Sequence, residues 1–243
     1  MKDTVSRRVR MPTSGFSIIT CTNRPSFIHN IFRNYKRQKG VKKELILVLN
    51  NDSMSKKHYK KYAKHYPNVR VYQLPARTSL GACLNFAVKK ARHSVIAKFD
   101  DDDYYSSLYA RDAIRTLAKS KAPVVGKSTF FMYFQGLRLL ILRHPHRENK
   151  TARIFPGGTL CFRKSVFKKV KFPHRSLGED GGFIWRCKKK GIRVYSGSRY
   201  HYCYVRRENR HSHTWKTTRS KLLSQKHRRI AYTSDFRKWI TKR

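Results

Sequence analysis

The first hundred residues alternate four times between a short apolar run and a segment whose apolar residues are spaced as in a helix. The apolar runs occupy residues 16–20, 44–49, 69–72 and 95–99. Near-continuous apolar runs are typical of parallel strands that are buried on both faces, with a helix crossing from each strand to the next. The sequence therefore predicts an α/β fold with a mostly parallel central sheet and helices on both of its faces.

The second half of the chain has a different pattern. After a helix through residues 108–117, short apolar runs predict several strands, and a further helix begins at residue 179. We expect a smaller mixed β region that lies beside the first half and shares its core. The expected boundaries are a basic lead (1–15), one domain (16–215) with two halves (16–105 and 106–215), and a basic, helical tail (216–243).

The chain is strongly basic, with 57 Lys and Arg against 13 Asp and Glu and a net charge of +44. This charge suggests an anionic neighbour, which would be nucleic acid, an acidic membrane surface or an anionic polymer, unless it merely solvates the surface. The basic residues are spread over the whole chain, so we expect no dedicated nucleic-acid element. Hydrophobic residues make up 39% of the chain and aromatic residues 13%, which favours a globular body.

The cysteines and the apolar runs bear on the compartment. The five cysteines are an odd number without a CxxC pair, which disfavours a disulfide framework or a zinc site and fits a reducing compartment. No apolar run approaches the roughly 20 residues that cross a bilayer, and residues 1–15 lack the apolar core of a secretory signal. We expect a cytoplasmic protein, with peripheral contact at an acidic membrane surface as the alternative.

Four consecutive carboxylates, Asp100 to Asp103, follow the fourth apolar run. The carboxyl end of a strand in an open α/β sheet is where ligands bind, and adjacent like charges need a metal dication or another cation to offset their repulsion. A solvated acidic turn is the alternative. Since six of only thirteen acids fall in this cluster and at Glu179-Asp180, a functional role is the stronger interpretation.

The pair Glu179-Asp180 opens a predicted helix, where the helix dipole favours carboxylates, so helix capping is an alternative that is compatible with catalysis. A nucleotide-type half-sheet with two acidic clusters suits transfer from a nucleoside-diphosphate sugar. A divalent metal held by carboxylates would neutralise the diphosphate, and Asp180 is suitable as the base for an acceptor hydroxyl.

Over residues 16–215 the chain resembles glycosyltransferase family 2, whose members have the GT-A fold. The resemblance is carried by four ordered motifs: Ile18-Ile19-Thr20-Cys21-Thr22-Asn23-Arg24-Pro25, Leu80-Gly81-x-x-Leu84-Asn85, Phe99-Asp100-Asp101-Asp102-Asp103 and Gly178-Glu179-Asp180. Residues 49–53, 97–100 and 212–215 look most like the small spore-maturation (Cge-type) glycosyltransferases of endospore formers. This resemblance implies an inverting, metal-dependent transferase of surface or spore polysaccharide or glycoconjugate synthesis, located in the cytoplasm, at a membrane or at the forming spore.

The resemblance also implies that residues 16–105 are the nucleotide-binding half and residues 106–215 the acceptor or catalytic half, and it implies roles for individual residues. Asp180 would be the catalytic base, with Glu179 as its acceptor-side partner. Asp102 and Asp100 would bind Mn²⁺ or Mg²⁺, and His213 would be a late metal ligand or phosphate contact, although a lone histidine is more often structural. The implied nucleotide-sugar pocket contains Thr20, Asn23, Arg24, Asn50, Arg77, Asn85, Asp100 and, near the ribose, Asp101.

One departure from the family pattern concerns the nucleotide base. Family members often carry Asp-Asp-Gly-Ser after the second strand, whereas this chain has Asn50-Asn51-Asp52-Ser53. Because asparagine can donate as well as accept hydrogen bonds, the base preference stays open. The acceptor, which the resemblance implies is a glycan or glycoconjugate, could itself be anionic. Two other functions stay as alternatives, a nucleic-acid or anionic-polymer binding protein and a nucleotidyltransferase.

Overall fold

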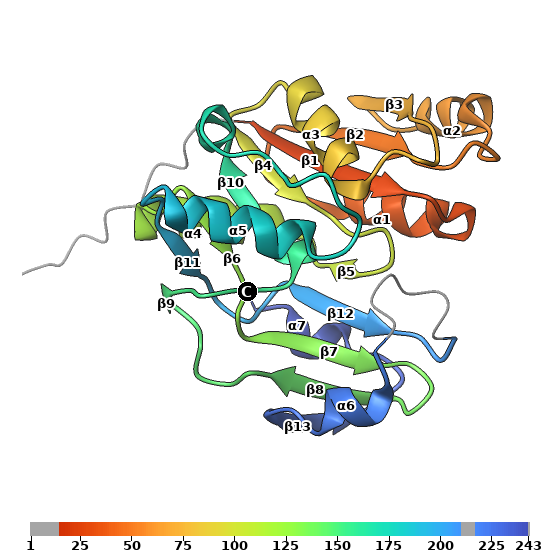
Figure 1. Ribbon diagram of the computed structural model, residues 1–243. Coiled ribbons are helices and arrows are strands. Elements are labelled where there is room, and N and C mark those ends of the chain that lie inside the picture. Colours follow the sequence, from red (N-terminus) through yellow and green to blue (C-terminus); the bar gives the residue numbers. More distant parts are fainter. Residues whose placement is uncertain (1–14, 210–216, 243) are drawn as a thin grey trace, which may run out of the picture.

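The computed structural model describes residues 15–209 and 217–242 and contains two β-sheets, the smaller of which lies below the larger in Figure 1. The larger sheet has eight strands in the order β3-β2-β1-β4-β10-β6-β11-β9. The smaller has five strands in the order β13-β8-β7-β12-β5. Both sheets contain parallel and antiparallel pairs, so the fold is α/β with mixed sheets.

The first half of the chain forms four parallel strands and the helices between them, as the apolar runs predict. In chain order these are β1 (Phe16–Thr22), α1 (Ile28–Arg37), β2 (Lys43–Leu49), α2 (Lys56–Ala63), β3 (Val69–Gln73), α3 (Leu80–Lys90) and β4 (Val95–Lys98). Thr22 pairs with Leu49, so β1 and β2 end at the same level, and Lys98 at the end of β4 pairs with Ile19, three residues before the end of β1. This register brings the loops that follow β1, β2 and β4 together.

Alternate residues of each strand point to opposite faces of the larger sheet, and each face has its own helices. On one face Ile18 and Leu45 join a core with α1, α2 and α4 (Tyr109–Ser120). On the other face Ile19 and Ile46 pack against α3 and α5 (Glu179–Lys189). The prediction of a sheet covered on both faces is therefore confirmed.

Strands from the second half of the chain extend the same sheet beyond β4. They are β10 (Cys161–Arg163), which is antiparallel to β4 and β6, together with β6 (Val124–Gly126), β11 (Val194–Ser196) and β9 (Lys150–Thr151). Gly157–Thr159, separated from β10 by Leu160 alone, form a short 3-10 helix beside the carboxyl end of β4. The second half thus contributes strands to both sheets, whereas the sequence predicts only a mixed β region that lies beside the first half.

The smaller sheet is built from β5 (Tyr104–Tyr105), β7 (Phe130–Phe134), β8 (Leu139–Arg143), β12 (Tyr202–Arg206) and β13 (His227–Tyr232). Two short helices, α6 (Arg219–Leu223) and α7 (Arg237–Ile240), flank β13. The expected helical tail is therefore only partly helical, because β13 pairs antiparallel with β8. Leu222 and Ile240 are fully buried, so the tail packs on the domain.

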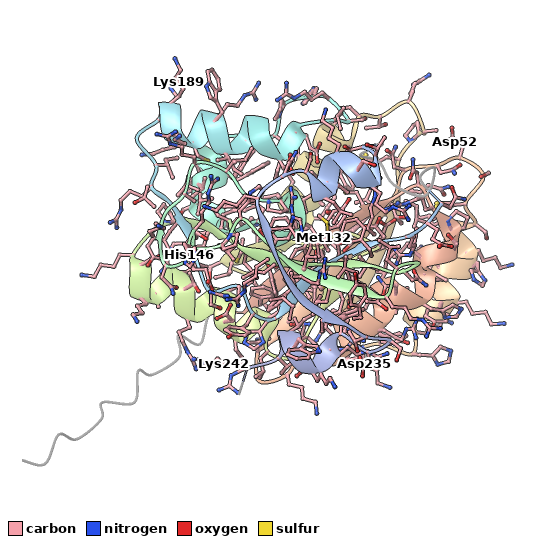
Figure 2. The ribbon with its side chains drawn as sticks, turned by 90° about the horizontal axis from the view of Figure 1, so that it is seen from below. Asp52, Met132, His146, Lys189, Asp235 and Lys242 are labelled. Carbon is pink, nitrogen blue, oxygen red and sulfur yellow. The ribbon has the colours of Figure 1, made fainter. Side chains whose placement is uncertain are left out.

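The basic side chains are distributed over the surface, as Figure 2 shows by the many nitrogen-tipped sticks around the ribbon. Lys189 and Lys242 are among the labelled side chains that point away from the body. Within residues 15–209 and 217–242 no helix is both long and apolar enough to cross a membrane.

Candidate active site

The four aspartates at the end of β4 have different surroundings, although they are consecutive in sequence. Asp103 is 1% exposed and accepts hydrogen bonds from the Tyr202 hydroxyl (2.5 Å) and the Val205 N–H (3.1 Å). Burial, followed by the nearby charges of Asp102 and Asp100, raises the pKa of Asp103 well above its usual value. Asp103 therefore anchors the acidic segment to β12 and does not face solvent.

Asp101 is held by the loop that follows β1. Its carboxylate accepts hydrogen bonds from the Thr22 hydroxyl (2.5 Å) and from Nε of Arg24 (3.2 Å). Arg24 also donates from Nη1 to Asp102 (3.1 Å), so one guanidinium joins two neighbouring carboxylates. Burial and the charge of Asp102 raise the pKa of Asp101 to about 6, although Arg24 acts in the opposite direction.

Asp100 is linked to the second acidic cluster through a buried lysine. Lys98 is 5% exposed, and its ammonium lies 2.5 Å from Oδ1 of Asp100 and 3.9 Å from Oε1 of Glu179. Burial opposes the charge of Lys98, but the attraction of Asp100, Glu179 and Asp180 outweighs it and raises the lysine pKa. Lys98 thus carries the positive charge between the two clusters.

Glu179 and Asp180 form the first turn of α5. The residue before them, Gly178, has φ +74°, a left-handed conformation that glycine adopts without strain. Burial raises the pKa of Glu179 to about 7, against the lowering effect of Lys98. Asp180 accepts a hydrogen bond at Oδ1 from the N–H of Gly181 (2.6 Å), so this oxygen stabilises the helix start, while Oδ2 lies against Gly157.

The two acidic clusters meet at Gly157 and Gly158, which begin the 3-10 helix before β10. A Cβ on Gly158 would lie 2.8 Å from Oδ2 of Asp100, and a Cβ on Gly157 would overlap Oδ2 of Asp180. Only glycine leaves room for both carboxylates at these positions. Asp100 and Asp180 are 80 positions apart in sequence, yet Asp100 lies against Gly158 and Asp180 lies against the neighbouring Gly157.

Four residues of the expected nucleotide pocket lie in the loops at the carboxyl ends of β1, β2 and β3, namely Asn23, Arg24, Asn50 and Arg77. Asn50 donates from Nδ2 to the Pro75 carbonyl (2.8 Å), and Asn51 donates to the carbonyl of Asn23 (3.1 Å), so these loops are tied together. Arg77 is exposed beyond β3, whereas Thr20 is buried within β1. The structure brings these loops to the same sheet edge as Asp100 to Asp103.

Asn85 has a different environment. It is 8% exposed in α3, and its amide both donates to the Phe172 carbonyl and accepts from the Phe172 N–H, each at 2.9 Å. These two bonds hold the start of the segment that leads to Gly178 and Glu179. The amide of Asn85 therefore fixes the backbone of Phe172, at the start of the segment that leads to Glu179 and Asp180. His213 lies outside the described residues.

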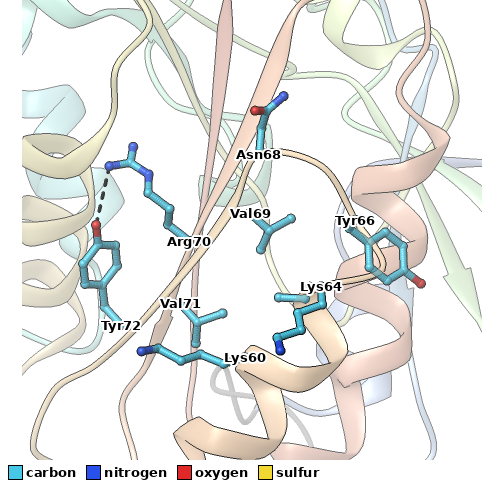
Figure 3. A pocket seen from close by; sticks show the side chains of 9 residues that line it. Lys60, Lys64, Tyr66, Asn68, Val69, Arg70, Val71 and Tyr72 are labelled. Carbon is cyan, nitrogen blue, oxygen red and sulfur yellow. Dashed lines mark hydrogen bonds between the residues drawn. The ribbon is translucent and has the colours of Figure 1, made fainter.

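Two cavities differ in their position relative to the acidic clusters, one beside α2 and β3 and one lined in part by Arg207. One of about 420 Å³ lies between α2 and β3, where Lys60, Lys64, Arg70, Tyr66 and Tyr72 contribute to its wall (Figure 3). Its lining contains neither acidic cluster, so it is separate from the candidate site. The other, of about 630 Å³, is lined in part by Arg138, Arg207 and Glu208, and Arg207 donates from Nη2 to the backbone carbonyl of Asp102 (2.8 Å). The second cavity therefore adjoins the acidic segment.

Comparison with known proteins identifies the family. Residues 17–171 match the family model described as Glycosyl transferase family 2. The chain belongs to glycosyl transferase family 2. One relative is the O-antigen biosynthesis glycosyltransferase WbnJ of Escherichia coli. It is 28% identical over 148 residues, which are 58% of this chain and 55% of WbnJ. This family 2 chain thus spans little more than half the length of that relative.

Solved structures confirm the GT-A fold for this family 2 chain. Staphylococcus aureus TarS 1-349 in complex with UDP-GlcNAc has a TM-score of 0.64 at 20% identity, covering 80% of this chain and 59% of TarS 1-349. The mannosyltransferase PcManGT of Pyrobaculum calidifontis, in complex with GDP-Man and Mn²⁺, has a TM-score of 0.61 at 17% identity, covering 79% of this chain and 56% of PcManGT. The likeness to spore-maturation enzymes in particular stays a prediction.

The acidic segment of this family 2 protein offers oxygen ligands for a metal ion, although it does not form a complete metal site by itself. Among the described residues there is no group of three or more His, Cys, Asp or Glu side chains arranged around a common point. Asp100 and Asp102 nevertheless offer carboxylate oxygens, the donors that Mg²⁺ and Mn²⁺ prefer, and Mg²⁺ is commonly held by one or two carboxylates plus substrate phosphates. The donor set therefore fits a dication that completes its coordination with a bound diphosphate.

Several residues that hold this family 2 site are not predicted from the sequence. Lys98, Tyr202 and Arg207 contact Asp100, Asp103 and Asp102 respectively. Lys98 alone has a signal in the sequence, because it is a charge at the end of an otherwise apolar strand, immediately before the aspartates. Tyr202 on β12 and Arg207, which follows β12, lie about a hundred positions from the aspartates in sequence, where nothing marks them.

Proposed function

We propose that this protein is an inverting glycosyltransferase that moves a sugar from a nucleoside-diphosphate sugar to an acceptor hydroxyl, with Asp180 as the catalytic base. One observation carries the proposal. Asp100 and Asp180, from the two acidic clusters, flank the consecutive glycines Gly157 and Gly158. This arrangement suits a donor diphosphate at one cluster and an acceptor hydroxyl at the other.

The donor would bind at the carboxyl edge of β1 to β4, where open α/β sheets bind ligands. Its pocket would be formed by Thr20, Asn23, Arg24, Asn50, Arg77, Asn85, Asp100 and Asp101. UDP-GlcNAc in the TarS complex and GDP-Man in the PcManGT complex support a nucleotide-sugar donor, without deciding between the two bases. Asn50 is suited to either base because its amide can donate and accept.

A divalent metal would be held by Asp102 and Asp100, with His213 as a further candidate ligand. The Mn²⁺ in the PcManGT complex supports Mn²⁺ or Mg²⁺ as the ion. When bound, the dication would supply positive charge to the diphosphate leaving group. Arg24 and Arg207 contact Asp102 and would hold its carboxylate and backbone in place.

The base acts on the acceptor. Asp180 takes the proton from the acceptor hydroxyl as the hydroxyl oxygen forms a bond to the anomeric carbon, and the bond to the diphosphate oxygen breaks with its electron pair on the diphosphate. Attack from the face opposite the leaving group inverts the anomeric configuration. Lys98 neutralises part of the negative charge around Asp180, and Glu179 lies beside Asp180 as its acceptor-side partner.

The acceptor would be a glycan or glycoconjugate. The O-antigen biosynthesis named for WbnJ supports surface polysaccharide synthesis, and the resemblance to spore-maturation enzymes supports a role at the forming spore, in the cytoplasm or at a membrane surface. The cavity that adjoins Asp102 carries two guanidinium groups, Arg138 and Arg207, and one carboxylate, Glu208. Its excess positive charge suits an anionic acceptor.

The test is the pair Asp180→Asn and Asp235→Asn. Asp180→Asn should lower turnover with nucleotide sugars by roughly 10² to 10⁴-fold, the usual contribution of a general base, while donor binding is retained. Asp235, an exposed aspartate near the C-terminus, serves as the matched control and should leave turnover unchanged. If Asp180→Asn keeps the full turnover rate of the wild type, Asp180 is not the catalytic base.

Donor binding is measured separately by the thermal shift that nucleoside diphosphates and their sugars produce with Mn²⁺ or Mg²⁺ present, since a ligand that binds only the folded form raises its melting temperature. The released product is identified in the same reaction. A nucleoside diphosphate supports glycosyl transfer, whereas pyrophosphate would indicate a nucleotidyltransferase.

A further inference from the structure

Three large hydrophobic side chains are exposed around the first turns of α5, which carries Asp180. Ile154 is 59% exposed, Leu177 66% and Trp185 59%. We call these three residues the apolar rim. Of the six exposed large hydrophobics among the described residues, half belong to this rim, and single exposed hydrophobics elsewhere need no special explanation.

The rim lies close to the proposed base. Leu177 is three residues before Asp180, in the loop that enters α5. Gly181 follows Asp180, and a Cβ at Gly181 would lie 3.9 Å from Cδ1 of Ile154. Because residues four apart share a helix face, Trp185 lies on the same side of α5 as Gly181. The rim therefore borders the approach to Asp180.

Basic residues flank the rim residues in sequence, and the acidic residues next to the rim are Glu179 and Asp180 of the site itself. Residues 153–155, 174–177 and 185–190 contain several Lys and Arg but no Asp or Glu. Lys189 lies one turn beyond Trp185, with its ammonium 5.2 Å from the centre of the indole ring, and Figure 2 shows Lys189 pointing away from the body. Tryptophan with lysine on one exposed helix face is typical of segments at a membrane surface, where the lysine reaches the headgroups.

We propose that the apolar rim seats this protein on an anionic phospholipid bilayer, with α5 lying in the plane of the surface and Asp180 held next to the headgroups. Aliphatic side chains such as Ile154 and Leu177 offer a sugar neither a ring face nor a hydrogen bond, whereas insertion between lipids removes their surface from water. The basic residues around them complement anionic headgroups. An acceptor carried on that surface would meet Asp180 directly. This role for the membrane rests on the proposed function, whereas the membrane contact itself does not.

Vesicle binding tests the contact without any measurement of turnover. The protein should co-sediment with vesicles that contain phosphatidylglycerol in phosphatidylcholine, and weakly or not at all with phosphatidylcholine alone. Trp185→Ala should weaken that binding by about ten-fold, as expected for the loss of one large apolar side chain from the bilayer. Trp239→Ala is the matched control, because Trp239 is 41% exposed and has Lys238 5.7 Å from its ring centre; it should bind as the wild type does.

A net charge of +44 could attract the vesicles through any part of the surface, so a second measurement is needed. A variant with Trp215→Phe and Trp239→Phe leaves Trp185 as the one tryptophan. Its emission should shift to shorter wavelength on vesicles and be quenched by brominated lipid tails. The variant that instead keeps only Trp239 should show neither change. Melting temperatures establish that all variants are folded.

Equal loss or equal retention of binding in Trp185→Ala and Trp239→Ala, or no quenching of Trp185, would overturn the proposal. A response of Trp185 to a soluble acidic polysaccharide but not to vesicles would also overturn it, in favour of a glycan surface. Failure of the proposed function is distinguishable, because Asp180→Asn should bind vesicles as the wild type does whether or not it retains turnover.

Discussion

Asp100 and Asp180 come from opposite halves of the chain and lie against neighbouring residues, Gly158 and Gly157. Asp100 follows β4 and Asp180 opens α5, and the glycines precede β10, the strand that pairs antiparallel with β4. This pairing places the backbone of the glycines next to the end of β4. The two carboxylates are thus positioned by the central sheet itself.

The first prediction concerns this glycine pair. Gly157→Ala places a Cβ where the carboxylate of Asp180 lies, and should displace it. Because a displacement of about 1 Å can cost roughly 10²-fold in rate, we expect a loss of that order in turnover, with the protein still folded. Gly181→Ala is the control, since the nearest atom to its new Cβ is 3.9 Å away and alanine favours a helix. Steady-state kinetics and melting temperatures compare the two; similar turnover in both would show that Asp180 has more freedom than its packing suggests.

The second prediction concerns the buried cation between the clusters. Lys98→Met leaves Asp100 and Glu179 without their shared ammonium, and removal of one partner from a buried ion pair typically costs about 3–5 kcal/mol. We expect a loss of that order in the free energy of unfolding, measured in urea with EDTA. Mn²⁺ should restore part of it, because a dication can replace the missing charge at Asp100.

Lys127→Met is the matched control for that experiment. Lys127 is also buried and lies 2.6 Å from a single carboxylate, that of Asp112. It should lose stability as well, but without recovery in Mn²⁺. Equal recovery of both variants would mean that Mn²⁺ acts elsewhere on the protein and not at Asp100.

The sheet and the acidic clusters are predictable from the sequence, but the partners of those acids are not. Apolar runs of strand length establish the parallel strands, and they place Asp100 to Asp103 at a strand end. The four aspartates look alike in sequence, yet Asp103 is buried against Tyr202 because β12 pairs with β5. The strand at residues 227–232 is not apparent either, since its residues are mostly basic or half-exposed and its pairing depends on β8.

The third prediction follows from the pKa of Glu179, which burial raises from 4.5 to about 7. The folded protein then holds this proton more tightly than the unfolded chain does, so the fold loses stability as pH rises from 4.5 to about 7, and the loss is complete above 7. Glu179→Gln cannot ionise. Its stability relative to the wild type should therefore increase through the same interval, by roughly 3 kcal/mol at most.

Urea unfolding of the wild type and of Glu179→Gln from pH 4.5 to about 8 measures the difference between their free energies of unfolding. Other groups titrate equally in both proteins, so their contributions cancel in this difference. The curves should converge near pH 4.5 and separate towards neutral pH. Parallel curves over the whole interval would show that Glu179 stays ionised in the fold with Lys98 as its full counter-charge.

The last prediction separates a structural aspartate from its catalytic neighbours. Tyr202→Phe removes the hydroxyl that donates to Asp103 and leaves that buried carboxylate with one backbone donor, Val205. The loss of one partner from a buried polar group should lower the free energy of unfolding by about 1–3 kcal/mol. Tyr232→Phe, at a tyrosine that is 65% exposed, should change it by less than about 0.5 kcal/mol. Turnover of the folded Tyr202→Phe protein should stay near that of the wild type, because Asp103 faces β12. A variant that keeps its stability but loses turnover would instead place Asp103 among the reacting groups.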